Sequence, residues 1–207
     1  MRSLLLLTAV TAFCVAQPSP DEVLRNVRRT YAGVTDATAS FTQTVAMRFG
    51  APKVQTGTVT VKKGNRYRVE TAEQTICSDG TTVWMATPAS NQVLVDDVRT
   101  NGRLFSPDAF LAGLPAEMRI DSLRTEGNTG RLSMTPTGGA AVRTVRSLTA
   151  WVDLRSWTVT RVEYTDRSRT TFTILLSGFT FDAGLPDSHF RYVPPKGMKT
   201  VDLRSVQ

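Results

Sequence analysis

The feature that most constrains this chain is a two-residue alternation of apolar and polar side chains that recurs along most of its length. In residues 38–49 the odd positions are mostly apolar, ending at Met47 and Phe49, whereas the even positions are mostly threonine or serine. Successive side chains of a β-strand point to opposite faces of its sheet. The pattern therefore predicts a long strand with one buried face.

The same alternation returns in shorter segments that are separated by turn residues. We expect these further strands: 58–62, 66–70, 75–78, 81–87, 92–95, 131–135, 147–153, 158–164, 170–181 and 200–203. Asp79-Gly80 is a strong hairpin signal, and Gly178 shifts the apolar parity, which predicts a bulge or bend. Short strands joined by short turns are typical of an antiparallel meander. The expected fold class is mainly β with short α-helices, a single antiparallel sheet of about eleven strands that curls into an incomplete barrel.

Two helices are expected beside this sheet. Ser19–Glu22 has a capping serine, a proline for the first turn and a glutamate that completes a capping box, and Gly33 is placed to end the helix. A second short helix is predicted at Ser106–Leu114. A curled sheet leaves a concave apolar face, so we expect these helices to form a lid over an apolar cavity.

The N-terminus has the layout of a cleavable secretory signal. Arg2 supplies a positive start, Leu4–Val15 is almost wholly apolar, and small residues surround Ala16. The apolar run is too short to cross a bilayer of roughly 30 Å comfortably. Phe13 is too bulky to precede a lipidated cysteine, so Cys14 is interpreted as part of the signal. We expect residues 1–16 to be removed after Ala16 and the mature protein to be periplasmic.

Removing 16 of the 207 residues leaves a mature chain, 17–207, that suits one domain with its own core. Cys77 is then the single cysteine, which excludes an internal disulfide, and a buried, inert thiol is expected. The formal charge is +7, but the basic residues are spread along the chain. Without a basic stripe, nucleic acid is not expected as a partner.

The sequence offers few candidate catalytic or metal-binding residues. His189 follows Asp187 and Ser188 directly, and neighbours in sequence cannot converge as a triad, so a polar turn at a short helical segment is expected. One histidine and one mature cysteine do not make a zinc site, and Asp96-Asp97 lacks the spacing of a calcium loop. The sequence therefore predicts a binding protein, not an enzyme, with no catalytic residue, metal or cofactor.

Several stretches, in order, resemble the LolA-type periplasmic lipoprotein carriers. They are Ala39–Gln43, Gly57–Lys63 with Tyr67–Val69, Ser78–Trp84 and Phe190–Gly197, and they cover about half of the mature chain. The resemblance implies an incomplete β-barrel whose helices lid an apolar cavity. It also implies a chaperone that accepts lipoproteins from an inner-membrane ABC transporter, shields their acyl chains and delivers them to an outer-membrane acceptor. We expect this carrier to be a monomer.

The residues of the cavity are predicted from the alternation. The expected acyl-chain-binding residues are Phe41, Val45, Val59, Val61, Tyr67, Val69, Val83, Met85, Phe110, Leu111 and Leu114. Trp84 is expected on the opposite face. Where this chain has Lys63, the family often has an arginine that holds the lid closed, so the resemblance implies lid control for Lys63, which keeps the charge but not the planar fork of donors.

Three other functions compete with this one. A LolA-like protein could carry another lipid, such as a glycolipid or pigment ester, for a different exporter. A periplasmic lipoprotein sensor would usually carry a second domain. The outer-membrane acceptor itself would need a lipidated N-terminal cysteine, against which Phe13 argues. The sequence does not identify the cargo, the transporter or the acceptor, nor whether the cavity is open or closed at rest.

Overall fold

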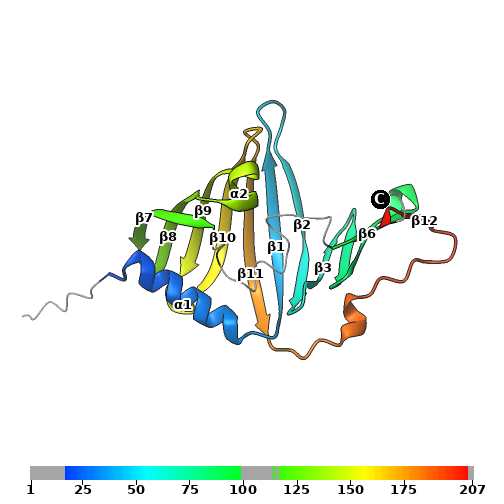
Figure 1. The fold of residues 1–207 in the computed structure, drawn as a ribbon, viewed down its shortest axis with the longest axis horizontal. Coiled ribbons are helices and arrows are strands. Elements are labelled where there is room, and N and C mark those ends of the chain that lie inside the picture. Colours follow the sequence, from blue (N-terminus) through cyan, green and yellow to red (C-terminus); the bar gives the residue numbers. More distant parts are fainter. Residues whose placement is uncertain (1–16, 99–113, 115–116, 205–207) are drawn as a thin grey trace, which may run out of the picture.

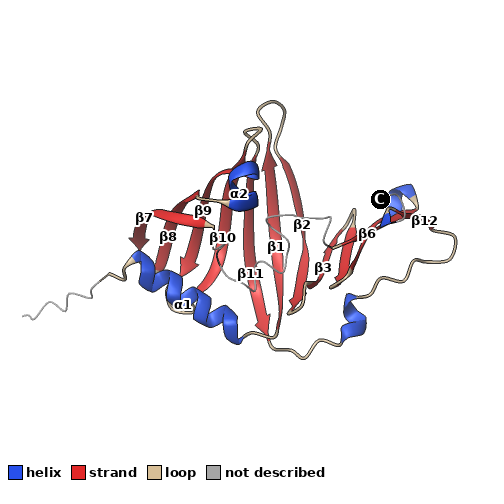
Figure 2. Cartoon of the chain, viewed as in Figure 1, coloured by secondary structure: helices blue, strands red, loops and turns tan. Residues whose placement is uncertain are grey.

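A single open sheet dominates the fold (Figures 1 and 2). The computed structural model describes residues 17–98, 114 and 117–204. The strands are β1 (Asp36–Ala46), β2 (Lys53–Lys62), β3 (Arg66–Thr71), β4 (Thr75–Asp79), β5 (Thr82–Thr87), β6 (Gln92–Asp97), β7 (Met118–Glu126), β8 (Thr129–Pro136), β9 (Val145–Asp153), β10 (Thr158–Asp166), β11 (Thr171–Phe181) and β12 (Lys199–Asp202).

The 12 strands have the order β12-β6-β5-β4-β3-β2-β1-β11-β10-β9-β8-β7. Every neighbouring pair is antiparallel except β12 and β6, which run parallel. In the described part of the chain the sheet does not close, and β7 and β12 are its edges. The mainly β fold with one curved, open sheet is confirmed. Strand β7 was not expected, because Met118, Ile120 and Leu123 are only half buried at the edge and a register shift interrupts their alternation.

Helix α1 (Pro20–Gly33) forms where its capping residues predict it. The Ser19 hydroxyl accepts a hydrogen bond from Glu22 N at 3.2 Å. Val23, Val27 and Tyr31 are buried along one face of the helix, which contacts β7 and β10. In Figure 1 the helix crosses the lower ends of the β7–β11 half of the sheet.

The core lies between α1 and the face of the sheet that it covers. One continuous cluster joins the buried helix residues to apolar side chains of β1, β2, β3, β5 and β8–β10. Its sheet members are Ala37, Val61, Tyr67, Val83, Leu132, Met134, Val145, Leu148, Ala150, Val152, Val159 and Val162. We call this side of the sheet the inner face.

The C-terminal segment covers the opposite, outer face near β3 and β4. A short 3-10 helix, η3 (Asp187–Phe190), contacts both strands, and Phe190 is completely buried. This confirms the short helical segment that was expected around His189. The chain then continues to β12, which pairs with β6 at the far edge.

Cys77 and Trp84 are paired across β4 and β5. Trp84 lies between Val83 and Met85, and side chains alternate between the two faces of a sheet, so Cys77 and Trp84 face the outer side. This is the face expected for Trp84. Cys77 is completely buried, and burial raises the pKa of its thiol to about 11. These surroundings make the Cys77 thiol unreactive, as the sequence predicts.

Two short helices complete the described elements, α2 (Gly139–Thr144) and the 3-10 helix η1 (Pro88–Ser90). Helix α2 begins at Gly139, with Gly138 as its N-cap residue. Residues 1–16 and the predicted lid helix, apart from Leu114, lie outside the described residues. Among the helices of the described chain, none has the length and apolarity needed to span a membrane.

Candidate functional site

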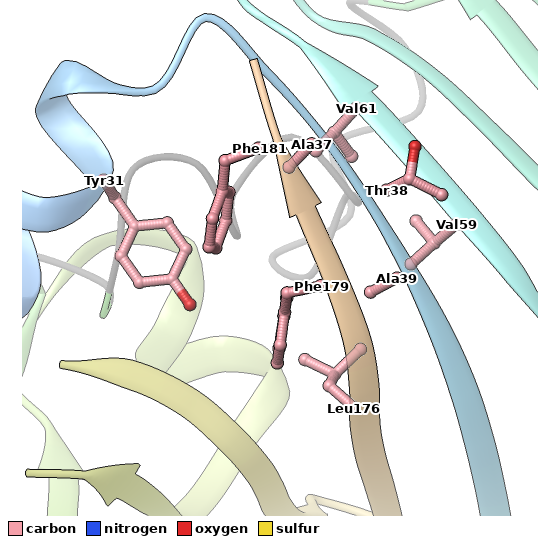
Figure 3. Close-up of a pocket in the computed structure, with 9 residues that line it drawn as sticks. All are labelled: Tyr31, Ala37, Thr38, Ala39, Val59, Val61, Leu176, Phe179 and Phe181. Carbon is pink, nitrogen blue, oxygen red and sulfur yellow. The ribbon is translucent and has the colours of Figure 1, made fainter. Parts of the chain in front are cut away.

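An apolar recess opens on the inner face where the end of α1 meets β1, β2 and β11 (Figure 3). Its volume is ≈ 350 Å³, including the part open to solvent. The lining residues are Tyr31, Ala37, Thr38, Ala39, Val59, Val61, Leu176, Phe179 and Phe181. The only polar atoms among these side chains are two hydroxyls, so the recess offers an uncharged, apolar surface.

A bulge in β11 shapes this surface. Thr38 pairs with Thr180 and Ser40 pairs with Ser177, so β11 has one residue more than β1 between these two rungs. Gly178 supplies a φ of +63° within the extra length, which a residue with a side chain rarely adopts. The bulge predicted at Gly178 is confirmed. As a result Leu176, Phe179 and Phe181 all line the recess despite their different parity.

Aromatic side chains form the wall between the recess and α1. Phe179 and Phe181 are stacked with ring centroids 5.7 Å apart, and the Tyr31 ring meets Phe181 edge-on at 6.4 Å. The Tyr31 hydroxyl accepts a hydrogen bond from Val159 N at 3.0 Å, which fixes the ring against β10. In Figure 3 the three rings stand together on one side, facing Val59, Val61 and Ala39 across the recess.

A smaller apolar cluster continues the recess along β1 and β11. Ala39, Phe41 and Leu176 are its buried members, and Val59, Val69, Ile174 and Phe179 pack against them. The Phe41 ring lies over Gly57 on the neighbouring strand, where an added Cβ would approach the ring within 2.9 Å. The absence of a side chain at Gly57 leaves room for the Phe41 ring here.

The structure brings some of the sequence-predicted site residues together and places others in the core. Val59 and Val61 line the recess, and Phe41 and Val69 belong to the adjoining cluster. Tyr67, Val83, Met85 and Leu114 belong to or pack against the main core, and Val45 is half buried further along β1. Phe110 and Leu111 lie outside the described residues.

Seven lining residues were missing from that set: Tyr31, Ala37, Thr38, Ala39, Leu176, Phe179 and Phe181. Tyr31 lies on the buried face of α1, and the parity shift at Gly178 brings Phe179 and Phe181 to the recess. The sequence signals were present, but they do not show which end of a long strand faces a recess.

Lys63 lies at the rim, in the turn between β2 and β3. Its ammonium group donates a hydrogen bond to Ala32 O at 2.8 Å, and its backbone N donates to Thr35 O at 3.1 Å. Both acceptors lie at the end of α1 or in the link to β1. Lys63 therefore ties the end of the helix to the turn beside the recess.

Nothing in the recess resembles a catalytic or metal centre. Among the described residues, no group of three or more His, Cys, Asp or Glu side chains is placed to hold a metal ion. His189 is on the outer face, where its Nε2 lies 2.9 Å from Thr60 Oγ1. What the recess can do chemically is to remove apolar groups from water.

The family to which the chain belongs is given by comparison with known proteins. Residues 32–193 match the protein-family model described as "Outer membrane lipoprotein carrier protein LolA". The chain belongs to the LolA family. Its match includes β1, β2 and β11, the three strands that line the recess.

One relative carries the same description, and two further proteins are similar in sequence or in fold. The "Outer-membrane lipoprotein carrier protein" of Methylibium petroleiphilum is 31% identical over 93% of this chain and 96% of its own length. The "Uncharacterized protein MJ0687" of Methanocaldococcus jannaschii is 22% identical over 91% of this chain and 55% of its length. A solved structure of an uncharacterized conserved protein from Thermus thermophilus shares the fold with a TM-score of 0.57, at 13% identity, covering 88% of this chain and 98% of that one.

Proposed function

We propose that this protein is a periplasmic lipoprotein carrier that shields acyl chains in the recess between α1, β1, β2 and β11. The mature domain would begin at Gln17 and act as a monomer without catalysis or a cofactor. The observation that carries the proposal is the uncharged apolar recess, open to solvent, in a chain of the LolA family.

The energetics of transfer fit such a site. Each CH₂ group of an acyl chain is worth about 0.8 kcal/mol on burial, so an unshielded lipoprotein does not cross water readily. Leu176, Phe179 and Phe181 present apolar surface without a charge that would have to lose its hydration. A carrier needs such a surface and needs no reaction chemistry.

The ≈ 350 Å³ of the recess includes space that is open to solvent, so the enclosed room is smaller still. The acyl chains of a lipoprotein need more room, so we propose that the end of α1 moves away from β1 and β2 when cargo enters. The hydrogen bond from Lys63 to Ala32 O would then be the latch that opens. This gives Lys63 the lid-control role expected from the family, exerted on α1.

The predicted acyl-chain-binding residues divide accordingly. Phe41, Val59, Val61 and Val69 would contact cargo first, because they lie in or beside the recess. Tyr67, Val83, Met85 and Leu114 would contact it only once α1 moves, because they lie in or against the core cluster under α1 and do not line the recess. An inner-membrane ABC transporter would load the carrier, and an outer-membrane acceptor would unload it.

The test is native mass spectrometry of the mature protein, purified without detergent and mixed with a purified triacylated lipoprotein. A one-to-one complex is expected for the wild type. Phe179→Glu puts a charge in the recess and should abolish the complex, whereas Thr180→Glu, on the exposed neighbouring residue, should not.

Two outcomes would contradict the proposal. Equal binding by Phe179→Glu and Thr180→Glu would remove the recess from the cargo site. Free lipid that co-purifies with the wild type, without any complex with lipoprotein, would favour a carrier of another lipid.

A further inference from the structure

The tip of the β1–β2 hairpin carries exposed apolar side chains that the recess does not use. Pairing between β1 and β2 ends at Val45 and Lys53, β1 itself ends at Ala46, and residues 47–52 form the connecting loop. Met47 is 46% exposed, Phe49 78% and Val54, at the start of β2, 63%. Large apolar side chains exposed together in one short segment mark a contact surface more strongly than isolated ones.

The tip is also positively charged. Arg48 and Lys53 flank Phe49, and the Arg48 guanidinium carbon lies 5.2 Å from the centre of that ring. From Ala37 to Val69 the sequence contains no aspartate or glutamate. The apolar side chains of the tip therefore lie among cations that no acidic residue between Ala37 and Val69 offsets.

The turn between β10 and β11 adds to this charge. Ala46 pairs with Thr171, which places residues 167–170 beside the hairpin tip, and Figure 1 shows both turns projecting at the same end of the sheet. Arg167 and Arg169 are exposed there. The one carboxylate of the turn, Asp166, accepts hydrogen bonds from Thr170 N at 2.8 Å and the Ser168 hydroxyl at 2.7 Å.

We propose that this hairpin tip docks on the surface of an anionic phospholipid bilayer. Phe49 and Met47 would enter the interface, and Arg48, Lys53, Arg167 and Arg169 would lie at the level of the lipid phosphates. This combination of exposed apolar side chains and cations is what interfacial membrane binding requires. Its position at a projecting end of the sheet lets it reach a flat surface.

A protein partner fits the tip less well. A stable protein interface buries roughly 800 Å² on each partner, which a six-residue loop and the short turn beside it do not supply. A bilayer surface needs only a few inserted side chains, and weak, reversible attachment suits a protein that must leave again. The proposal does not depend on cargo, because the tip and the recess share no lining residue.

The test is flotation of lipoprotein-free protein with vesicles of phosphatidylethanolamine and phosphatidylglycerol, and with vesicles of phosphatidylcholine alone. We expect binding to the anionic vesicles only, weakening as salt is raised because charges attract less through a screening solution. Phe49→Ser and the double variant Arg48→Glu/Lys53→Glu should each lower the bound fraction by about tenfold. Val193→Ser, which removes an 83% exposed valine elsewhere, is the matched control and should bind normally.

A tryptophan reporter gives a second reading. Emission of Phe49→Trp should shift to the blue when anionic vesicles are added, and emission of Val193→Trp should not. The proposal is overturned if the wild type does not float, if Phe49→Ser floats as well as the wild type, or if Val193→Ser loses as much binding as Phe49→Ser. Normal flotation of Phe49→Ser with impaired delivery of lipoprotein would also overturn it, in favour of a protein partner at the tip.

Discussion

The two faces of the sheet are covered in different ways. On the inner face α1 is held mainly by apolar side chains, Val23, Val27 and Tyr31. On the outer face η3 is held around one buried ring by polar contacts: Lys62 Nζ lies 2.7 Å from Asp187 Oδ1, and Thr60 bonds His189. Apolar contacts have no fixed direction, whereas hydrogen bonds and ion pairs fix the position of one segment relative to another.

This difference bears on function. A cover held by non-directional contacts can exchange helix surface for acyl chain, because both present hydrocarbon to the same apolar face. A cover held by directional contacts loses them when it moves. We therefore expect α1, the inner cover, to move away from the sheet during transport and η3, the outer cover, to remain in place.

The largest effect is expected from Phe190→Ala on the outer face. Phe190 is fully buried, and truncating such a ring costs about 3–5 kcal/mol, so the free energy of unfolding in urea should fall by that amount. Lipoprotein binding by the protein that remains folded should be unchanged. Val193→Ala, at an exposed position nearby, should leave both quantities alone. Loss of binding at full stability would mean that the outer cover takes part in transport.

The next effect concerns Asp36, the first residue of β1, which connects the end of α1 to the segment that leads to η3. Its buried carboxylate accepts hydrogen bonds from Ala183 N at 2.9 Å, Gly184 N at 3.1 Å and Leu185 N at 3.2 Å, at the start of the segment that leads to η3. Asp36→Ala leaves these donors without their acceptor and should cost about 3 kcal/mol in urea unfolding.

Asp182→Ala is the control for Asp36→Ala. Its exposed carboxylate accepts one hydrogen bond, from Thr35 N at 2.7 Å, and its removal should cost no more than about 1 kcal/mol. Equal losses for the two variants would show that burial of Asp36 adds nothing to its hydrogen bonds.

Lys62 and Lys63 are adjacent in sequence but hold different covers. Lys62 donates to Leu185 O and Asp187 near η3, whereas Lys63 donates to Ala32 O at the end of α1. Lys63→Ala should change stability by less than about 1 kcal/mol, because the bond is exposed, yet raise the binding of a fluorescent fatty acid to the recess several-fold. Lys62→Ala should not raise it. An equal increase for both lysines would contradict the separation of the two covers.

How far the sequence predicts this molecule depends on whether the signal is local. Ser19 begins α1 through local capping, the helix ends at Gly33 as predicted, and Gly178 marks the bulge through a local change of parity. Strand β7 was not expected, because an edge strand has no fully buried face and its alternation is weak. The N-cap residue of α2 is Gly138, which has no side chain to make a capping hydrogen bond, so the sequence gives no local signal for this helix.

The candidate site was less predictable than the fold, for a physical reason. Alternation shows that Val59, Val83 and Met85 share one face, but an apolar side chain in a core and one in a recess obey the same pattern. Val59 lines the recess, whereas Val83 is completely buried, and the difference depends on where α1 ends above the sheet. That position is set by contacts between distant segments, such as the one from Tyr31 to Val159.

The smallest effect expected is a pH dependence that arises on the outer face alone. Burial, and then the nearby Arg68 guanidinium, lower the pKa of His189 below its ordinary value of 6.5, against a weaker opposite effect of Glu70. The unfolded chain takes up a proton near that value while folded His189 stays neutral. The free energy of unfolding should therefore fall as the pH drops through 6.5, until the lower pKa of the folded state is reached.

Urea unfolding at pH 7.5 and 5.5 separates this contribution from the others. His189→Gln keeps a polar partner for Thr60 but does not titrate, so the variant should lose less stability than the wild type over that interval. Lipoprotein binding should follow the same pH course in both proteins, because the recess contains no group that titrates there. A binding curve that moved with the His189 substitution would instead couple the two covers, and the inner cover would no longer be the one that opens independently.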